Sequence, residues 1–563
     1  EYFGTPYPYR KLDLIAVPES FGGAMENVGA VTYDEYLILM DENSPLSQRR
    51  SYTAVHAHEL GHMWFGNLVT PEWWNDIWLN EAFATWIMNK AADRYWPEGE
   101  FDRETLKGAL GAMTNDSLAA ARQIREPVDH NDAIGDAFDG ITYQKGGGVL
   151  AMLERYVGEA GFQAGIRLHM DRHQDGTATA EDFIASVAEG SDRTEIEGAF
   201  KTYIEQAGVP LLSVSVNCAD GQRPTLEVRQ TRYAPLGSAI DPTANQWQVP
   251  FCVAFDDGAE RNSQCTLLAE RQQTIELDAE TCPASVMPNA DGTGYYRFAL
   301  DKAGWQGLVE DAAQLAAAEA LVLADSLDAA FRAGRVPAET YVSGMAALVN
   351  HDAWDVADAA ASNLESITSI VDSEQLLTVE PALQKIAKPR FDSLAAATGA
   401  GNELLQQRLQ RFLIVIAKDQ AMRAPLARQA ALRLGLNGEP DPSAASPSEL
   451  ETIFSIGVQD LGEPFFDLLL QEAISSQDPA FRNSAIGALA RVEDPVLVER
   501  LQASIISGDF KGTEMLQIIF RQMVRAKTTE LTYAWIKEND TVVIERIPET
   551  FRSRIVPAFG SAF

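Results

Sequence analysis

The spacing of apolar and polar residues changes twice along the chain and divides it into three blocks. Over residues 1–208, helical spacing is mixed with short strand-like runs at 11–17 and 30–33. Over residues 209–302, apolar and polar positions alternate in runs such as 212–216 and 247–251, with glycine, proline and asparagine turns between them. Alternation of this kind predicts short β-strands, here a small β-sandwich.

The third block, residues 303–563, is rich in alanine and leucine at helical spacing. Asp478-Pro479 and Asp494-Pro495 recur sixteen residues apart, and each pair is typical of a helix N-cap followed by a first-turn proline. This pattern predicts stacked helical hairpins in a solenoid of the HEAT or armadillo type. The three blocks together predict a multi-domain α+β protein.

Length and charge narrow the function classes. A chain of 563 residues with 46% hydrophobic residues has room for three or more domains. Its net charge of −36 argues against nucleic-acid binding, because a phosphate backbone would be repelled. No apolar run is long enough to predict a membrane span. The chain opens at Glu1 with neither an initiator methionine nor a signal peptide, so we expect a processed product or a fragment.

The most informative motif is His58-Glu59-Leu60-Gly61-His62. Histidines at i and i+4 lie on one face of a helix, so both imidazoles can reach one metal ion. Glu59 lies beside the first histidine, where it can take a proton from a metal-bound water. The motif predicts a zinc hydrolase. Its alternative is a chance match on a surface helix with two solvated histidines.

The residues around the motif disfavour that alternative. The segment after it is strongly apolar, and six of the ten tryptophans lie between Trp64 and Trp96. Polar groups within such a stretch are expected to be paired or bound to a metal. His56 points away from His58 around the helix, so we interpret it as a packing or supporting residue and not as a ligand.

Eighteen residues separate His62 from Glu81, which lies in a run with a large apolar face, 78–87. A carboxylate within that face needs a partner, and a metal provides one. Glu81 is therefore the candidate third ligand, with one position left for water. The alternative is a partly exposed glutamate at the start of a helix.

Three motifs together resemble the gluzincin metallo-aminopeptidases of the aminopeptidase N and leukotriene hydrolase family. They are the zinc motif with Glu81, the upstream run Gly23-Ala24-Met25-Glu26-Asn27, and the later segment 138–146 around Tyr143. They occur in the order found in that family, with compatible spacing. The resemblance is strong between residues 23 and 146 and is only architectural elsewhere.

The resemblance implies a thermolysin-like catalytic domain over residues 1–208 and one Zn²⁺ per chain. It implies that Gly23, Ala24, Met25, Glu26 and Asn27 bind the substrate, with the Glu26 carboxylate on the free α-ammonium. It also implies Glu59 as general base and Tyr143 as the donor that stabilises the oxyanion. On its own, a tyrosine before Lys-Gly-Gly-Gly is more often structural, and an isolated Glu26 would fit an ordinary turn.

The chain departs from the family pattern at both ends. Family members usually carry a β-domain of roughly two hundred residues before the signature glutamate, whereas 25 residues precede Glu26 here. That domain typically supplies a second polar contact to the substrate amine. The helical block also looks shorter than in many members. We therefore expect a truncated form with an incomplete grip on its substrate.

All four cysteines lie in the predicted β-block, which favours disulfides and an oxidising location, periplasmic or secreted. Four buried thiols in a cytoplasmic enzyme are the alternative. A strand through Cys252 that turns and returns through Cys265 would pair these two, leaving Cys218 with Cys282. Four cysteines nevertheless allow three connectivities.

The predicted function is removal of N-terminal amino acids from peptides with a free N-terminus. A gluzincin endopeptidase would share the zinc ligands without needing Glu26, and an epoxide hydrolase of the leukotriene-hydrolase type would use the same metal site. The retention of Glu59 and Tyr143 argues against a peptide-binding relative without activity. The preferred side chain and the oligomeric state stay open.

Overall fold

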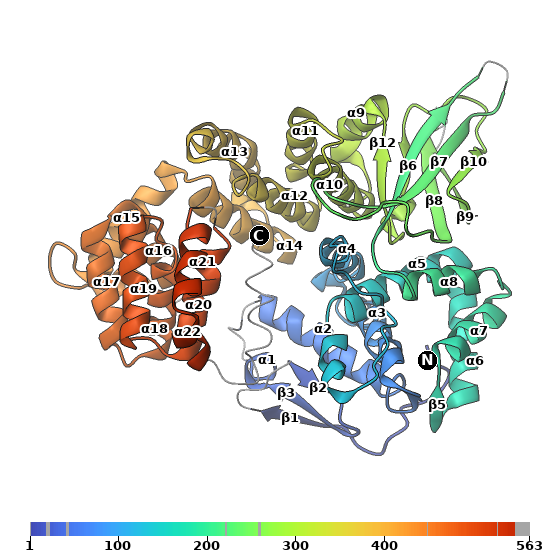
Figure 1. Ribbon diagram of the computed structural model, residues 1–563, viewed down its shortest axis with the longest axis horizontal. Helices are drawn as coiled ribbons and strands as arrows, with labels where there is room; N and C mark the ends of the chain where they lie inside the picture. The colour runs from blue at the N-terminus through green and yellow to red at the C-terminus, as the bar shows by residue number, and fades with distance from the viewer. Residues whose placement is uncertain are drawn as a thin grey trace. The chain divides into compact units, whose positions relative to one another are not determined.

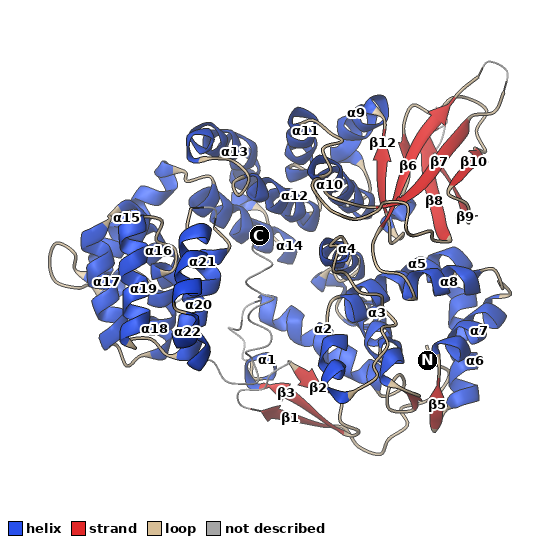
Figure 2. Ribbon diagram, in the orientation of Figure 1, coloured by secondary structure: helices blue, strands red, loops and turns tan. Residues whose placement is uncertain are grey.

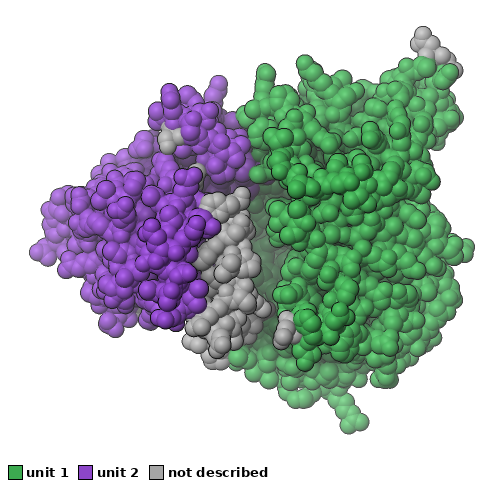
Figure 3. Space-filling view, in the orientation of Figure 1, with its two compact units in different colours: residues 1–360, 396–405 green, residues 361–395, 406–563 purple. Residues whose placement is uncertain are grey.

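The computed structural model describes residues 2–17, 23–40, 44, 46–219, 222–256, 261–446, 449–525 and 527–546. Figure 1 shows the chain as a ribbon. It divides into two compact units, which the space-filling view of Figure 3 shows in different colours. Unit 1 comprises residues 1–360 and 396–405, and unit 2 comprises residues 361–395 and 406–563.

Unit 1 begins with a three-stranded sheet in the order β1-β3-β2. Its strands are β1 (Asp13–Val17), β2 (Ala24–Met25) and β3 (Ala30–Asp34), so both predicted strand-like runs are confirmed. β1 pairs with β3 in parallel, and β2 pairs with β3 antiparallel. Val31 and Tyr33 of β3 are fully buried and pack with Met63, which anchors this sheet beside the end of the motif helix.

Helices make up most of the remainder of residues 1–208, as Figure 2 shows. The longest are α2 (Leu46–His62), which carries the motif, and α3 (Trp78–Tyr95), which carries Glu81. The others are α1 (Glu35–Ile38), α4 (Glu104–Asp116), α5 (Gly146–Val157), α6 (Glu159–His173), α7 (Ala180–Ser191) and α8 (Ile196–Ile204), with a π-helical turn η4 (Ile141–Lys145) and the parallel pair β4 (Val69–Pro71) and β5 (Gly176–Ala178).

Two sheets follow, with strand orders β10-β7-β6-β12 and β11-β8-β9. Their strands are β6 (Pro210–Asn217), β7 (Thr225–Arg232), β8 (Val249–Asp256), β9 (Arg261–Leu268), β10 (Gln272–Glu276), β11 (Val286–Met287) and β12 (Arg297–Leu300). Buried residues of both sheets, including Leu212 and Val253, join the same hydrophobic cluster as the helices before them.

Both predicted disulfides are present in this region. Cys252 and Cys265 face each other in the β8–β9 register and are bonded, and Cys218 is bonded to Cys282. The turn predicted between the strands of Cys252 and Cys265 falls outside the described residues.

The chain after β12 is helical. Its helices are α9 (Lys302–Asp311), α10 (Ala317–Arg332), α11 (Ala338–Val349), α12 (Trp354–Ile367), α13 (Ser373–Ser393), α14 (Ala400–Arg411), α15 (Gln420–Leu434), α16 (Leu450–Asp460), α17 (Glu463–Ser475), α18 (Pro479–Leu489), α19 (Pro495–Ser507), α20 (Gly512–Met523), α21 (Thr529–Glu538) and α22 (Asp540–Glu545). The predicted cap is confirmed at α19, where the Asp494 carboxylate accepts from two N–H groups of the first turn. The fold is thus mixed α+β with a helical C-terminal part. Among the described residues, no helix has the length and apolar character needed to cross a membrane.

Candidate metal centre

The helix pair α2 and α3 brings the predicted ligands together. Gly61 lies between the two histidines of the motif, and a Cβ at this position would lie 2.9 Å from Ile87 Cγ2 and 3.4 Å from Ala84 Cα. A larger residue would therefore push the two helices apart. The close approach places Glu81 of α3 opposite His58 and His62 of α2.

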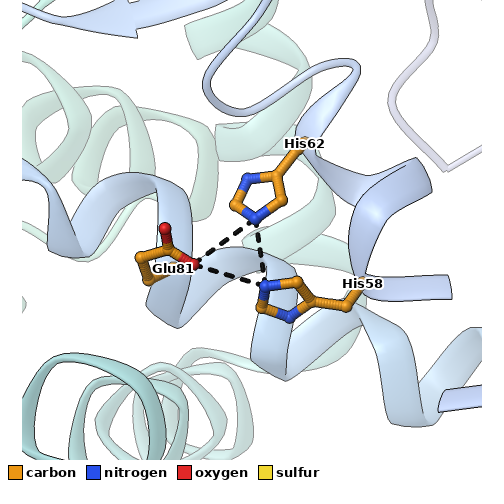
Figure 4. Close-up of side chains that lie close together, drawn as sticks. All are labelled: His58, His62 and Glu81. Carbon is orange, nitrogen blue, oxygen red and sulfur yellow. Dashed lines mark hydrogen bonds and ion pairs between the residues drawn. The ribbon is translucent and has the colours of Figure 1, made fainter. Parts of the chain in front are cut away.

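Three ligand atoms converge on one point, as Figure 4 shows. His58 Nε2 lies 3.0 Å from His62 Nε2 and 3.3 Å from Glu81 Oε2, and His62 Nε2 lies 3.4 Å from the same carboxylate oxygen. His62 and Glu81 are buried, and the His58 side chain is 12% exposed. Two imidazole nitrogens and one carboxylate oxygen form a donor set suited to Zn²⁺.

The surroundings of His62 fix which ring nitrogen faces the other ligands. Its Nδ1 lies 3.1 Å from the backbone carbonyl oxygen of Phe65, a partner that only accepts hydrogen bonds. Nδ1 therefore carries the proton in the neutral ring, which leaves the Nε2 lone pair directed at His58 and Glu81. This is the tautomer that metal ligation requires.

The charges of the side chains at this centre favour the binding of a cation. Burial alone raises the pKa of Glu81, yet its hydrogen bonds to His58 and His62 lower it to about 2. Burial lowers the pKa of His58. Burial opposes the charged form of His62 as well, but its hydrogen bond to Glu81 and the charges of Glu81, Glu26 and Glu59 raise its pKa to about 9. Three carboxylates and two imidazoles in a buried site leave excess negative charge, which a divalent ion would neutralise.

Glu59 lies in the same helix and points toward this centre. It is 5% exposed, and its Oε2 atom is buried without a hydrogen-bond partner among the described residues. Burial, together with the charges of Glu26 and Glu81, raises the pKa of Glu59 to about 8. A buried carboxylate oxygen without a partner is costly in a structural role, so it marks a place where a polar ligand belongs.

Glu26 reaches the centre from β2 and its following turn. Its carboxylate, that of Glu59 and a ring nitrogen of His62 lie within 4.8 Å of one another. The Glu26 carbonyl accepts a hydrogen bond from Asn67, in the loop after α2, at 2.9 Å. Of the rest of this motif, Ala24 and Met25 form β2 at the edge of the sheet, Gly23 precedes it and Asn27 begins the turn into β3.

Tyr143 lies beside the ligands, in the π-helical turn η4. Its ring is stacked on that of His58 with centroids 5.9 Å apart. Burial and the neighbouring Glu81 raise the pKa of the Tyr143 hydroxyl, which keeps it protonated and able to donate. The glycines after the turn explain this position, because a Cβ on Gly146 would lie 2.5 Å from Ala82 Cβ, the residue next to Glu81.

A buried ion pair fixes the end of this turn. The Lys145 ammonium lies 2.9 Å from Asp116 Oδ2, and both side chains are fully buried. Asp116 also accepts hydrogen bonds from the Tyr295 hydroxyl at 3.1 Å and from the Gly208 N–H at 2.8 Å. Lys145 donates to the carbonyl of Gln206 at 3.3 Å. The turn carrying Tyr143 is thereby tied to α4 and to the start of the β-region.

A second contact fixes the start of the turn. The Asp139 carboxylate accepts from the N–H groups of Ile141 and Thr142 at 2.8 and 3.3 Å. Arg122 in turn donates to Asp139 and, at 2.7 Å, to the Thr142 hydroxyl. None of these supporting residues was predicted. The Lys-Gly-Gly-Gly run was the only signal, since adjacent glycines within a helical segment indicate close packing.

His56 is not at the centre. Its Nδ1 lies 2.8 Å from the Tyr33 hydroxyl, and its ring is stacked on Tyr52. The interpretation of His56 as a packing residue agrees with this position.

Comparison with known proteins agrees with the geometry. Residues 1–203 match the peptidase family M1 domain, and residues 285–563 match an ERAP1-like C-terminal domain. The chain thus combines a segment similar to the M1 peptidase domain with a segment similar to the ERAP1-like C-terminal domain.

Its relatives include aminopeptidase M1-A of Oryza sativa subsp. japonica, at 27% identity over all of this chain and 64% of the relative. Mitochondrial aminopeptidase 2 of Saccharomyces cerevisiae is 28% identical over 97% of this chain and 57% of its own length. Puromycin-sensitive aminopeptidase of Caenorhabditis elegans is 32% identical over 73% of this chain and 45% of its own length. The chain thus spans about two thirds or less of the length of these relatives.

Proposed function

We propose that this protein is a zinc-dependent aminopeptidase that removes N-terminal amino acids from peptides. The observation that carries the proposal is the Glu26 carboxylate within 4.8 Å of Glu59 and His62, beside the ligand cluster. An anionic group so close to the reacting centre suits a substrate whose α-ammonium lies next to the scissile bond. The aminopeptidase names of the relatives support the same activity.

His58, His62 and Glu81 would hold one Zn²⁺, which when bound acidifies water and polarises the substrate carbonyl. Glu59 takes the proton from the attacking water and passes it to the leaving amine. The Tyr143 hydroxyl donates to the oxyanion that develops on the former carbonyl. Glu26 holds the α-ammonium, and the edge strand β2 offers backbone groups to an extended peptide.

The proposal also assigns three domains to the chain. Residues 1–208 are the thermolysin-like catalytic domain, 209–302 the β-sandwich and 303–563 the HEAT- or armadillo-like domain. Two disulfides support a periplasmic or secreted location, because such bonds persist in oxidising compartments.

Substitution of Glu26 tests the proposal. Glu26→Ala should lower kcat/KM on an alanyl or leucyl fluorogenic amide by roughly ten- to a hundred-fold, the effect of losing one charge-assisted hydrogen bond of about 1.5–3 kcal/mol. Zinc content should not change. Glu72→Ala, which removes an exposed carboxylate, is the matched control. If the Glu26 variant keeps its preference for free over N-acetylated substrates, Glu26 does not bind the α-ammonium. Cleavage of N-acetylated peptides by the parent chain would instead favour the endopeptidase alternative.

A further inference from the structure

A hollow of about 860 Å³ lies wholly within unit 2 and far along the chain from the metal centre. Four carboxylates line it, from Glu365, Glu380, Glu451 and Glu493. More cations than carboxylates line it: Arg411, Lys418, Arg491, Arg521, Arg525 and Lys527. Positive side chains thus outnumber negative ones in the hollow, whereas the whole chain has a net charge of −36.

Glu493 neutralises its neighbours only partly. The Lys527 ammonium is bonded to it at 2.8 Å, while Lys418 lies 3.5 Å and Arg525 3.7 Å from its oxygens. One carboxylate is therefore shared among three cations. Lys418 has a second acidic neighbour, Glu380, at 3.3 Å, whereas Arg525 forms no other ion pair with the residues that the structure describes.

Glu451 is shared in the same way. It forms a close ion pair with Arg521, and Arg491 reaches it only at 3.5 Å. The Nε atom of Arg491 is buried without a hydrogen-bond partner among the described residues. Glu365 is also shared, because it is bonded at 2.8 Å to Arg408, which does not line the hollow, while its charge acts on Arg525 as well.

Three guanidinium groups are thus left incompletely neutralised. Across the described part of unit 2, no carboxylate lies within ion-pair distance of Arg411. Burial and the charge of Arg525 lower the pKa of Arg491 to about 10, with Arg521 and Arg411 acting in the same direction. Burial also lowers the pKa of Arg525, and Arg521 and Arg411 again contribute. These positive charges lie close together in a concave site, which concentrates the positive electrostatic potential there.

We propose that this hollow binds a small multivalent oxyanion, an organic compound bearing two or more phosphate or carboxylate groups. Guanidinium forks match the oxygens of either group, and one such ligand would neutralise Arg411, Arg491 and Arg525 together. The volume is that of a small-molecule site. Apolar lining from Leu376, Val415 and Ile416 gives room for a carbon skeleton between the charged groups.

Titration calorimetry on the full chain at fixed 0.15 M ionic strength tests the proposal, with tripolyphosphate and citrate as probes. We expect saturable binding of at least one probe at one site per chain. Stronger binding of tripolyphosphate indicates a phosphorylated ligand, and stronger binding of citrate a polycarboxylate. Absence of saturable binding of both probes overturns the proposal.

Variants locate the site. Arg491→Gln combined with Arg525→Gln should weaken binding at least about tenfold, because two charged donors are lost. Arg428→Gln, which removes an exposed arginine of α15 outside the hollow, should bind like the parent chain. If the double variant fails to fold, Arg411→Gln replaces it, since Arg411 is exposed and its loss should weaken binding several-fold without affecting folding. Unchanged affinity in the folded variant contradicts the assignment.

Discussion

The helix pair α2–α3 and the turn η4 reach the same centre by different means. His58 and His62 are four residues apart on one helix, and Glu81 lies on the helix packed against it, so short-range spacing and one helix contact place all three. Tyr143 instead depends on Asp116, which lies on another helix, and on Asp139. The ligands are positioned locally, whereas the tyrosine is positioned by tertiary contacts.

This difference implies that metal binding and transition-state stabilisation are separable. Damage to η4 or its supports should leave the ligand geometry of α2 and α3 intact, because their packing at Gly61 does not involve the turn. Substitution of Glu59, a non-ligand residue of α2, should act on chemistry without removing the metal. Single substitutions can test whether the two are separable.

The largest effect is expected from Glu59→Gln. Loss of the general base should lower kcat by roughly 10²–10⁴-fold. Zinc content should stay at the parent level, because Glu59 is not one of the three converging ligands. Steady-state turnover on an alanyl fluorogenic amide, combined with metal analysis of the same sample, measures both. Near-parent turnover would show that another group accepts the proton.

Tyr143→Phe should have the next largest effect. Removing one donor to an oxyanion costs roughly 10²–10³-fold in kcat. KM should change little, since the contact forms mainly in the transition state. The ring stacked on His58 is retained in phenylalanine, so the ligands should not move. A rise in KM with unchanged kcat would mean that the hydroxyl binds the ground state instead.

Lys145→Met tests whether the buried ion pair positions Tyr143. Leaving Asp116 buried without its cation should lower the free energy of unfolding by about 3–5 kcal/mol. In the folded fraction, kcat should fall about tenfold, because a displacement of the hydroxyl weakens its contact with the oxyanion. In a Tyr143→Phe background the same substitution should add little, since the group it positions is already absent.

A matched control separates positioning from general destabilisation. Arg423→Met removes a buried guanidinium that is paired at 2.6 Å with the exposed Asp460 in unit 2, and it should lower stability without changing kcat. If Lys145→Met lowers kcat equally with and without the Tyr143 hydroxyl, the ion pair does not act through Tyr143.

The sequence predicted the locally positioned residues of the site but not the residues that position Tyr143. The predicted placement of His58, Glu59 and His62 follows from helix geometry, and that of Glu81 from its position in an apolar face. The pairing of Cys252 with Cys265 follows from two strands joined by a short connection. The strand-like runs at 11–17 and 30–33 were predicted by their apolar character. Each of these predictions depends on residues that are close together in the sequence or that belong to one regular element.

Lys145 and Asp116 were not predicted, because no spacing rule relates residues 29 positions apart on different elements. The close packing of Gly146 on Ala82 is equally non-local. The basic hollow of unit 2 could not be predicted either. Its cations come from α14, from α20 and from the segments that follow η8 (Phe412–Ile416), α18 and α20. The sequence of this helical block indicates the helices by their periodicity but not which of their residues meet.

The central claim is that α2 and α3 alone hold the catalytic metal, and metal analysis of purified protein tests it most directly. The parent chain, Lys145→Met and His62→Ala are compared by inductively coupled plasma mass spectrometry after dialysis against zinc-free buffer. The account predicts about one zinc per chain for the parent and for Lys145→Met, and loss of stoichiometric zinc for His62→Ala. Full zinc retention by His62→Ala would contradict it.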